Sequence, residues 1–107
     1  MQHMTPGELK NWLEDSTLDA PILLDVREPW EFALCQIAGS QNIPMGNIAA
    51  DLARLDPDAC YVVICHHGVR SYQVAGFLER QGFEKMVNLD GGVAAWAEQV
   101  DHNMARY

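Results

Sequence analysis

The sequence predicts an α/β fold in which a mostly parallel central sheet carries helices on both faces. Short apolar runs alternate along the chain with segments of helical spacing, which is the pattern of such a sheet. The apolar runs are continuous rather than alternating, as expected for strands buried on both faces. Because 107 residues are enough for one hydrophobic core, we expect a single domain over residues 1–107.

The expected strands share apolar side chains and are followed by turn-forming residues. They are 22–26 (ILLDV), 61–65 (YVVIC) and 85–89 (KMVNL), with a brief extended piece at 42–44 (NIP). The strand at 61–65 is the clearest of them.

The first expected helix begins at Thr5, which forms a capping-box pattern with Glu8 and precedes Pro6 at the first helical position. The remaining helical segments are recognised by apolar spacing or by a proline or glycine at one end. They are a turn at Pro29, the segments 46–55 and 71–82, and an Ala-rich helix that holds Trp96.

Composition restricts the partners and the compartment. A net charge of -8 and a pI near 4.7 argue against nucleic acid and against an anionic membrane surface. Three cysteines form no regular framework, so we expect free thiols in a reducing compartment. With neither a signal-peptide pattern nor a long apolar run, a cytoplasmic location and no membrane partner are expected.

The segment CHHGVRS, residues 65–71, combines a thiol with a tight loop and a fixed positive charge. If Cys65 ends a strand and Arg70 opens a helix, the backbone N–H groups between them can surround the sulfur and favour negative charge there. A thiolate so formed is a nucleophile. Gly68 allows the tight turn, Ser71 is suited to cap the helix, and Arg70 offers a planar fork to an oxyanion or to a carboxylate partner.

This segment resembles the active-site loop of the rhodanese family, Cys-x-x-Gly-x-Arg-Ser. Three more segments are similar to family motifs and follow the same order, namely LLDVREPWEF (23–32), IAGSQNIP (37–44) and VNLDGGVAAW (87–96). The resemblance implies a single rhodanese-like domain with thiosulfate sulfurtransferase activity. It would take sulfur from thiosulfate or a related small donor and pass it to a thiol or cyanide through a persulfide on Cys65, without cofactor or metal.

The resemblance also implies roles for individual residues. Cys65 and Arg70 would be catalytic, and Asp25, Arg27 and Glu28 would support the site. From the residues themselves two readings of this acidic and basic turn stay open. Its charges are either solvated or locally paired, or Asp25 or Glu28 lies beside Arg70 and orients its fork, because Asp25 ends a central strand at the same rim. The other loop residues would bind substrate; they are His66, His67, Gly68, Val69 and Ser71.

Several alternatives remain open from the sequence. The domain could be a sulfur-carrier or redox-regulatory module that a partner protein loads, as in a sulfur relay. Arsenate reduction or phosphatase chemistry is disfavoured, because related enzymes of this fold use a loop longer than the five residues 66–70. Cys35 replaces a residue of the family motif and is either a packed thiol or a second thiol that resolves the persulfide. A metal site at His66 and His67 is disfavoured by their adjacency.

Overall fold

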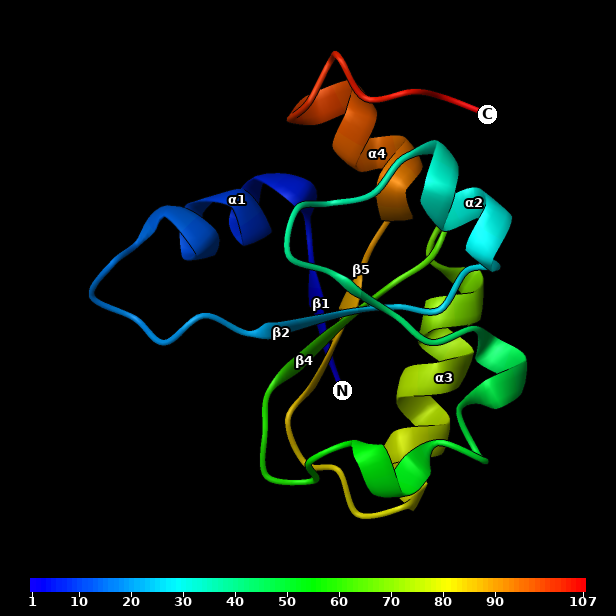
Figure 1. Ribbon diagram of the computed structural model, residues 1–107. Helices are drawn as coiled ribbons and strands as arrows, with labels where there is room; N and C mark the ends of the chain where they lie inside the picture. The colour runs from blue at the N-terminus through cyan, green and yellow to red at the C-terminus, as the bar shows by residue number, and fades with distance from the viewer.

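A computed structural model describes all 107 residues, Met1–Tyr107. Five strands form one sheet in the order β1-β5-β4-β2-β3, and every neighbouring pair is parallel (Figure 1). The strands are β1 (Gln2–Met4), β2 (Ile22–Asp25), β3 (Gln41–Asn42), β4 (Tyr61–Ile64) and β5 (Met86–Leu89). The predicted α/β fold with a parallel sheet is confirmed.

The chain forms four α-helices, of which three lie between strands and the fourth follows the last strand. They are α1 (Pro6–Glu14), α2 (Pro29–Leu34), α3 (Val69–Arg80) and α4 (Gly92–Gln99). The predicted capping box at the start of α1 is present, since Thr5 and Glu8 exchange side-chain-to-backbone hydrogen bonds. No helix in the structure has the length and apolar character that a membrane crossing requires.

The prediction of a regular helix over 46–55 is wrong. This segment contains two 3₁₀ turns, η1 (Met45–Asn47) and η2 (Leu52–Arg54). Asn47 and Asp51 interrupt the apolar pattern, and short polar side chains of this kind favour turns over helix interiors.

The edge strand β1 was not predicted. Its three residues pair with β5, and its backbone is continued by a bond from the N–H of Asp90 to the carbonyl of Met4. A three-residue strand with two exposed side chains carries no periodic signal in the sequence.

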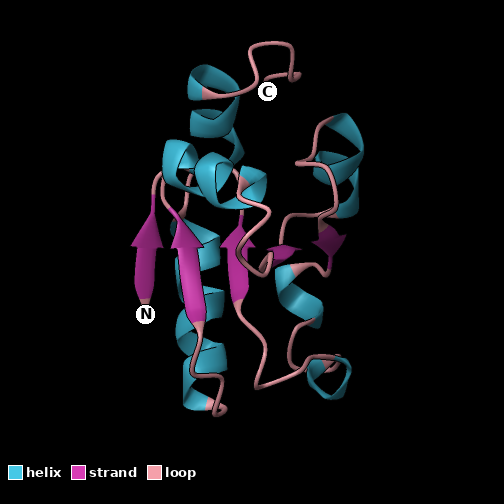
Figure 2. Cartoon of the chain, turned by 90° about the vertical axis from the view of Figure 1, so that its left-hand side faces the viewer, coloured by secondary structure: helices cyan, strands magenta, loops and turns pink.

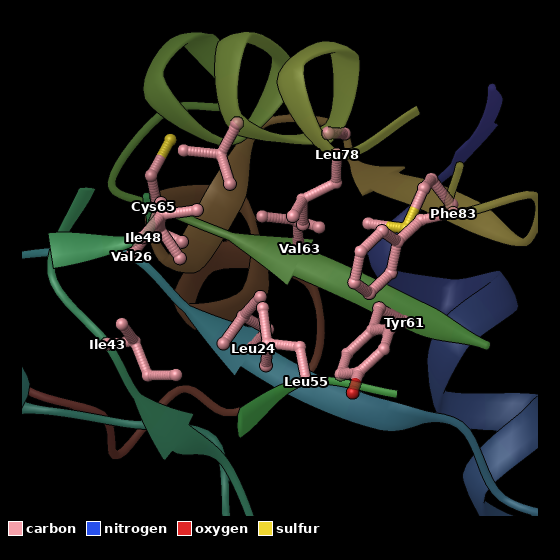
Figure 3. Close-up of a cluster of buried hydrophobic side chains, with 13 residues drawn as sticks. Leu24, Val26, Ile43, Ile48, Leu55, Tyr61, Val63, Cys65, Leu78 and Phe83 are labelled. Carbon is pink, nitrogen blue, oxygen red and sulfur yellow. The ribbon is translucent and has the colours of Figure 1, made fainter. Parts of the chain in front are cut away.

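Two buried hydrophobic clusters lie on opposite faces of the sheet. Successive side chains of β4 alternate between them: Val63 packs with Leu78 of α3 (Figure 3), whereas Val62 packs with Leu9 of α1 and Trp96 of α4. Figure 1 shows α1 and α3 on opposite sides of the sheet. Burial on both faces explains why these strands are continuously apolar, and the predicted two-sided packing is confirmed.

The parallel arrangement places the carboxyl ends of all strands at one end of the sheet. Figure 2 shows the strand arrowheads at the end nearest the C-terminal tail. The loops that follow β2, β4 and β5 therefore meet there, which is where α/β sheets bind their ligands.

Candidate active site

Cys65 follows β4 directly and is almost completely buried, with 1% of its surface exposed. Its Sγ atom accepts a hydrogen bond from the backbone N–H of Gly68 at 3.0 Å. Gly68 is the N-cap of the 12-residue helix α3 and has φ of 101°, a left-handed conformation that favours glycine. The sulfur thus lies at a helix N-terminus beside an inward-pointing N–H group, as the loop sequence predicts.

The turn between β5 and α4 supports this loop from behind. The N–H groups of Val93 and Ala94 donate to the carbonyls of Cys65 and His66 at 2.9 and 3.0 Å. A Cβ atom on Gly92, whose φ is 58°, would collide with those same two carbonyl oxygens. The absence of a side chain at Gly92 therefore lets α4 approach the loop that follows Cys65.

Replacing Gly92 by alanine should therefore destabilise the protein by roughly 1–3 kcal/mol through backbone strain, with displacement of the loop in addition. Urea unfolding measures this loss. Gly46→Ala is the matched control, because its Cβ would meet no atom within 4 Å and its φ is not positive. Equal stability of the two variants would contradict the supporting role of Gly92.

A chain of buried polar groups lies behind the sulfur. Ser71 Oγ is 3.3 Å from Cys65 Sγ and donates to Asn88 Oδ1 at 2.5 Å. Asn88 Nδ2 donates in turn to the carbonyl of Gly68 and to Asp90 Oδ1, at 3.3 and 3.0 Å. Ser71 therefore does not cap α3, and that expectation is wrong, because the helix begins at Val69 and the hydroxyl is directed into the protein.

Asn88 was missed by the sequence reasoning. It is 3% exposed within β5, and a polar side chain inside the otherwise apolar run KMVNL is the one signal that would have marked it. A buried amide requires hydrogen-bond partners, and the partners of Asn88 are the loop backbone at Gly68 and the Ser71 hydroxyl beside Cys65.

The carboxylate partner of Arg70 is Glu31 of α2. Arg70 Nη1 and Nη2 donate to its two oxygens at 2.7 and 2.9 Å, in a bidentate pair whose Glu31 side chain is 5% exposed. The expectation that Asp25 or Glu28 orients Arg70 is wrong, because Asp25 binds Arg27 and Glu28 lies exposed at the N-cap of α2.

Asp25 and Arg27 form a second ion pair in which both side chains are fully buried. Arg27 Nη2 donates to Asp25 Oδ2 at 2.8 Å and to the carbonyl of Cys35 at 2.6 Å. These bonds join the end of β2 to the residue that follows α2. The Asp25–Arg27 pair therefore joins β2 to α2, and few N–H donors of Arg27 remain for a ligand.

Tyr107 connects the two ion pairs. Its hydroxyl donates to Glu31 Oε2 at 2.7 Å and accepts from Arg27 Nη1 at 2.9 Å. Its ring stacks on His66 with centroids 3.9 Å apart and planes 7° from parallel. No local pattern in the sequence indicates this role, because the contacts to Arg27 and Glu31 span 80 and 76 positions.

The electrostatics keep these groups in fixed ionisation states. Hydrogen bonds from Arg70 lower the pKa of Glu31 to about 2, and burial raises the pKa of Tyr107 to about 12. Burial lowers the pKa of His66 below its ordinary value of 6.5, with the charge of His67 acting in the same direction. Near neutral pH, Glu31 is an anion, and Tyr107 and His66 are mostly neutral.

The lowered pKa of Glu31 predicts an acid-sensitive contribution to stability. A carboxyl with a depressed folded-state pKa stabilises the protein above its unfolded value of 4.5, and this contribution is lost as the pH falls toward 2. Between pH 5 and pH 2.5, the free energy of unfolding measured with urea should drop by on the order of 2 kcal/mol more in the wild type than in Glu31→Gln. The same drop in both proteins would contradict this assignment.

The remaining loop residues occupy different surroundings. His66 and His67 line a cleft of about 190 Å³ between the loop, α4 and the C-terminal tail. Val69 is 66% exposed at the start of α3 and does not line this cleft. No group of three or more His, Cys, Asp or Glu side chains is arranged to share a metal ion.

The three cysteines are free thiols, and the structure does not bring a second one to Cys65. Cys35 packs in the cluster with α1 and α4 and accepts a 3.6 Å bond from Arg27 Nη1, whereas Cys65 packs in the cluster with α3. Cys60 lies before β4, at the other end of that strand, and burial raises the pKa of its thiol. Of the two readings of Cys35, the packing supports the structural thiol.

A buried cysteine at the carboxyl end of a central parallel strand, inside a short loop that opens a helix, defines the class of protein. The profile of the Rhodanese-like domain family matches residues 5–99. The chain belongs to the rhodanese-like domain family.

This chain is similar to known proteins of the family in both sequence and structure. Thiosulfate sulfurtransferase GlpE of Pseudomonas aeruginosa is 34% identical over 95 residues, which cover 89% of this chain and 83% of that protein. A crystal structure of a rhodanese-like domain protein from Staphylococcus aureus superimposes with a TM-score of 0.84 at 35% identity, covering 94% of this chain and 95% of the other.

Another relative is much longer than this chain. The probable adenylyltransferase/sulfurtransferase MoeZ of Mycobacterium tuberculosis is 39% identical over 106 residues, which cover 97% of this chain but 26% of MoeZ. The chain thus spans about a quarter of that protein.

Proposed function

We propose that this chain is a rhodanese-type sulfurtransferase. It moves a sulfane sulfur from thiosulfate or a related donor to a thiol or cyanide, with a persulfide on Cys65 as the intermediate. The observation that carries the proposal is the position of Cys65 Sγ at the N-terminus of α3, with the N–H of Gly68 at 3.0 Å. Residues 1–107 act as one domain in this proposal.

The reaction proceeds in two displacements at sulfur. The Cys65 thiolate attacks the outer sulfur of thiosulfate, the S–S bond breaks, and sulfite leaves with the electron pair. The charge of the resulting persulfide then lies on the added sulfur. A thiolate or cyanide attacks that outer sulfur, takes it as a persulfide or thiocyanate, and releases the Cys65 thiolate.

The site supports an anionic sulfur in two ways. The N-terminus of α3 and the N–H of Gly68 supply positive dipole ends that favour negative charge on the cysteine and on the loaded sulfur. In addition, the carbonyls of Cys65 and His66 accept hydrogen bonds from α4, so these two negative dipole ends are directed toward α4. The names of relatives such as GlpE and MoeZ support sulfur transfer as the reaction class.

A second candidate role is a sulfur carrier that receives its sulfur from a partner protein. It is favoured by the match to MoeZ, of which the corresponding segment is one part. Both roles use the same Cys65 persulfide and differ in the donor.

Intact mass spectrometry tests the proposal. Reduced protein is mixed with excess thiosulfate, desalted and weighed beside the three single variants Cys35→Ser, Cys60→Ser and Cys65→Ser. We expect a gain of one sulfur atom in the wild type and in the first two variants only. No gain in the folded wild type would reject thiosulfate as donor, and a gain in Cys65→Ser would reject Cys65 as the acceptor thiol.

A further inference from the structure

Both guanidinium groups near Cys65 are paired with carboxylates of the protein. Arg70 donates through Nη1 and Nη2 to the two oxygens of Glu31, and Arg27 donates to Asp25, to the carbonyls of Glu31 and Cys35, and to Tyr107. The two Nη groups of Arg70, which could bind a sulfonate, therefore bind the carboxylate of Glu31 instead.

This carboxylate is not easily displaced. The Glu31 side chain is 5% exposed and also accepts from the Tyr107 hydroxyl and from the N–H of Glu28. A donor that took Arg70 for itself would leave a buried carboxylate without its counter-charge, which is strongly unfavourable. Arg70 and Glu31 thus act as one neutral unit toward an incoming ligand.

Few other cationic groups are near the sulfur. Asp25 with Arg27 and Glu31 with Arg70 form two ion pairs without net charge, in which the Arg70 side chain is 34% exposed and the other three are buried. The chain as a whole carries a net charge of -8. Arg106 lines the cleft with His66, His67 and Glu98, and its Nη2 donates to the carbonyl of Ala97 in α4. Backbone N–H groups and the helix N-terminus remain as the anion-binding features closest to Cys65.

From this balance we propose that Glu31 determines donor specificity by holding Arg70, so that the site favours thiol persulfides with little further negative charge over dianionic sulfonate donors. The inference rests on the proposed sulfur-transfer function and narrows its donor class. In the favoured reaction the Cys65 thiolate attacks the outer sulfur of R–S–SH. The S–S bond breaks, RS⁻ leaves with the electron pair, and Cys65 becomes the persulfide Cys–S–SH.

The test compares donors that share one chemistry and differ in charge. The persulfide of 2-mercaptoethanol has a neutral organic part, and the persulfide of 2-mercaptoethanesulfonate carries a sulfonate of similar size. The second-order rate constant for loading Cys65 with each donor is measured by quenching and intact mass, and thiosulfate serves as a third donor. In the wild type we expect the neutral persulfide to load roughly tenfold faster than the sulfonate persulfide, the scale of one unfavourable charge interaction.

The variant Glu31→Gln leaves the charge of Arg70 without its partner. We expect it to reduce the tenfold difference to about twofold and to raise the thiosulfate rate several-fold. Glu28→Gln is the matched control, because it removes one exposed negative charge from the same helix without touching Arg70. It should leave the ratio of the two persulfides as in the wild type.

The outcomes separate the two proposals. Equal rates for both persulfides in the wild type would overturn the donor-class inference, and this measurement does not depend on any variant. An equal effect of Glu28→Gln and Glu31→Gln on the ratio would overturn the role of Glu31. Failure of every donor to load folded wild-type protein would instead overturn the proposed sulfur transfer itself.

Discussion

Replacement of Cys65 by serine is expected to abolish sulfur transfer and to leave the protein folded. A serine hydroxyl is a weak nucleophile and cannot carry the sulfur as a persulfide, so the turnover number should fall by at least about a thousandfold. The smaller side chain fits the buried position, and its oxygen can accept from the N–H of Gly68, which now bonds the sulfur.

Thiosulfate:cyanide transfer measures the loss, and urea unfolding monitors the fold. Cys35→Ser is the comparison, because it replaces a thiol with the same side chain away from the sulfur of Cys65. Transfer by the folded Cys65→Ser protein above the rate without enzyme would reject the persulfide mechanism.

Replacement of Arg27 by methionine is expected to give a large loss of stability. Asp25 would remain fully buried without its counter-charge, and removal of one member of a buried ion pair typically costs about 3–5 kcal/mol. The same change deprives the carbonyl of Cys35 and the hydroxyl of Tyr107 of a donor.

The double variant Asp25→Asn/Arg27→Met separates charge from packing. Because it leaves no unpaired charge, it should lose clearly less stability than Arg27→Met alone when both are measured by urea unfolding. A single variant that loses under about 1 kcal/mol would show that Asp25 finds another partner or becomes protonated at little cost.

The sequence predicts those parts of the fold that depend on residues close together along the chain. β2, β4 and β5 are continuous apolar runs, and the loop after β4 combines a cysteine, a glycine and an arginine at close spacing. Local patterns of this kind report burial and turn geometry directly. They locate Cys65 at the end of a buried strand without any knowledge of the tertiary structure.

The partners of that loop could not be predicted in the same way. Glu31 meets Arg70 across 39 positions, Tyr107 meets Arg27 across 80, and which carboxylate faces which guanidinium depends on how α2 and the tail pack. The sequence reasoning chose Asp25 and Glu28 because of their place at a strand end. It therefore expected the correct kind of partner for Arg70 but named the wrong residue.

The bonds from Val93 and Ala94 to the carbonyls of Cys65 and His66 have a consequence for the energetics of transfer. They fix the orientation of the peptide dipoles around the sulfur before any donor arrives. In the proposed persulfide reaction, charge would then move from the cysteine sulfur to the added sulfur and back without a rearrangement of the loop, so little reorganisation energy would oppose either displacement. Helix α4 is distant from this loop in sequence but hydrogen-bonded to it, and it would thus hold the loop in one arrangement through both halves of the proposed reaction.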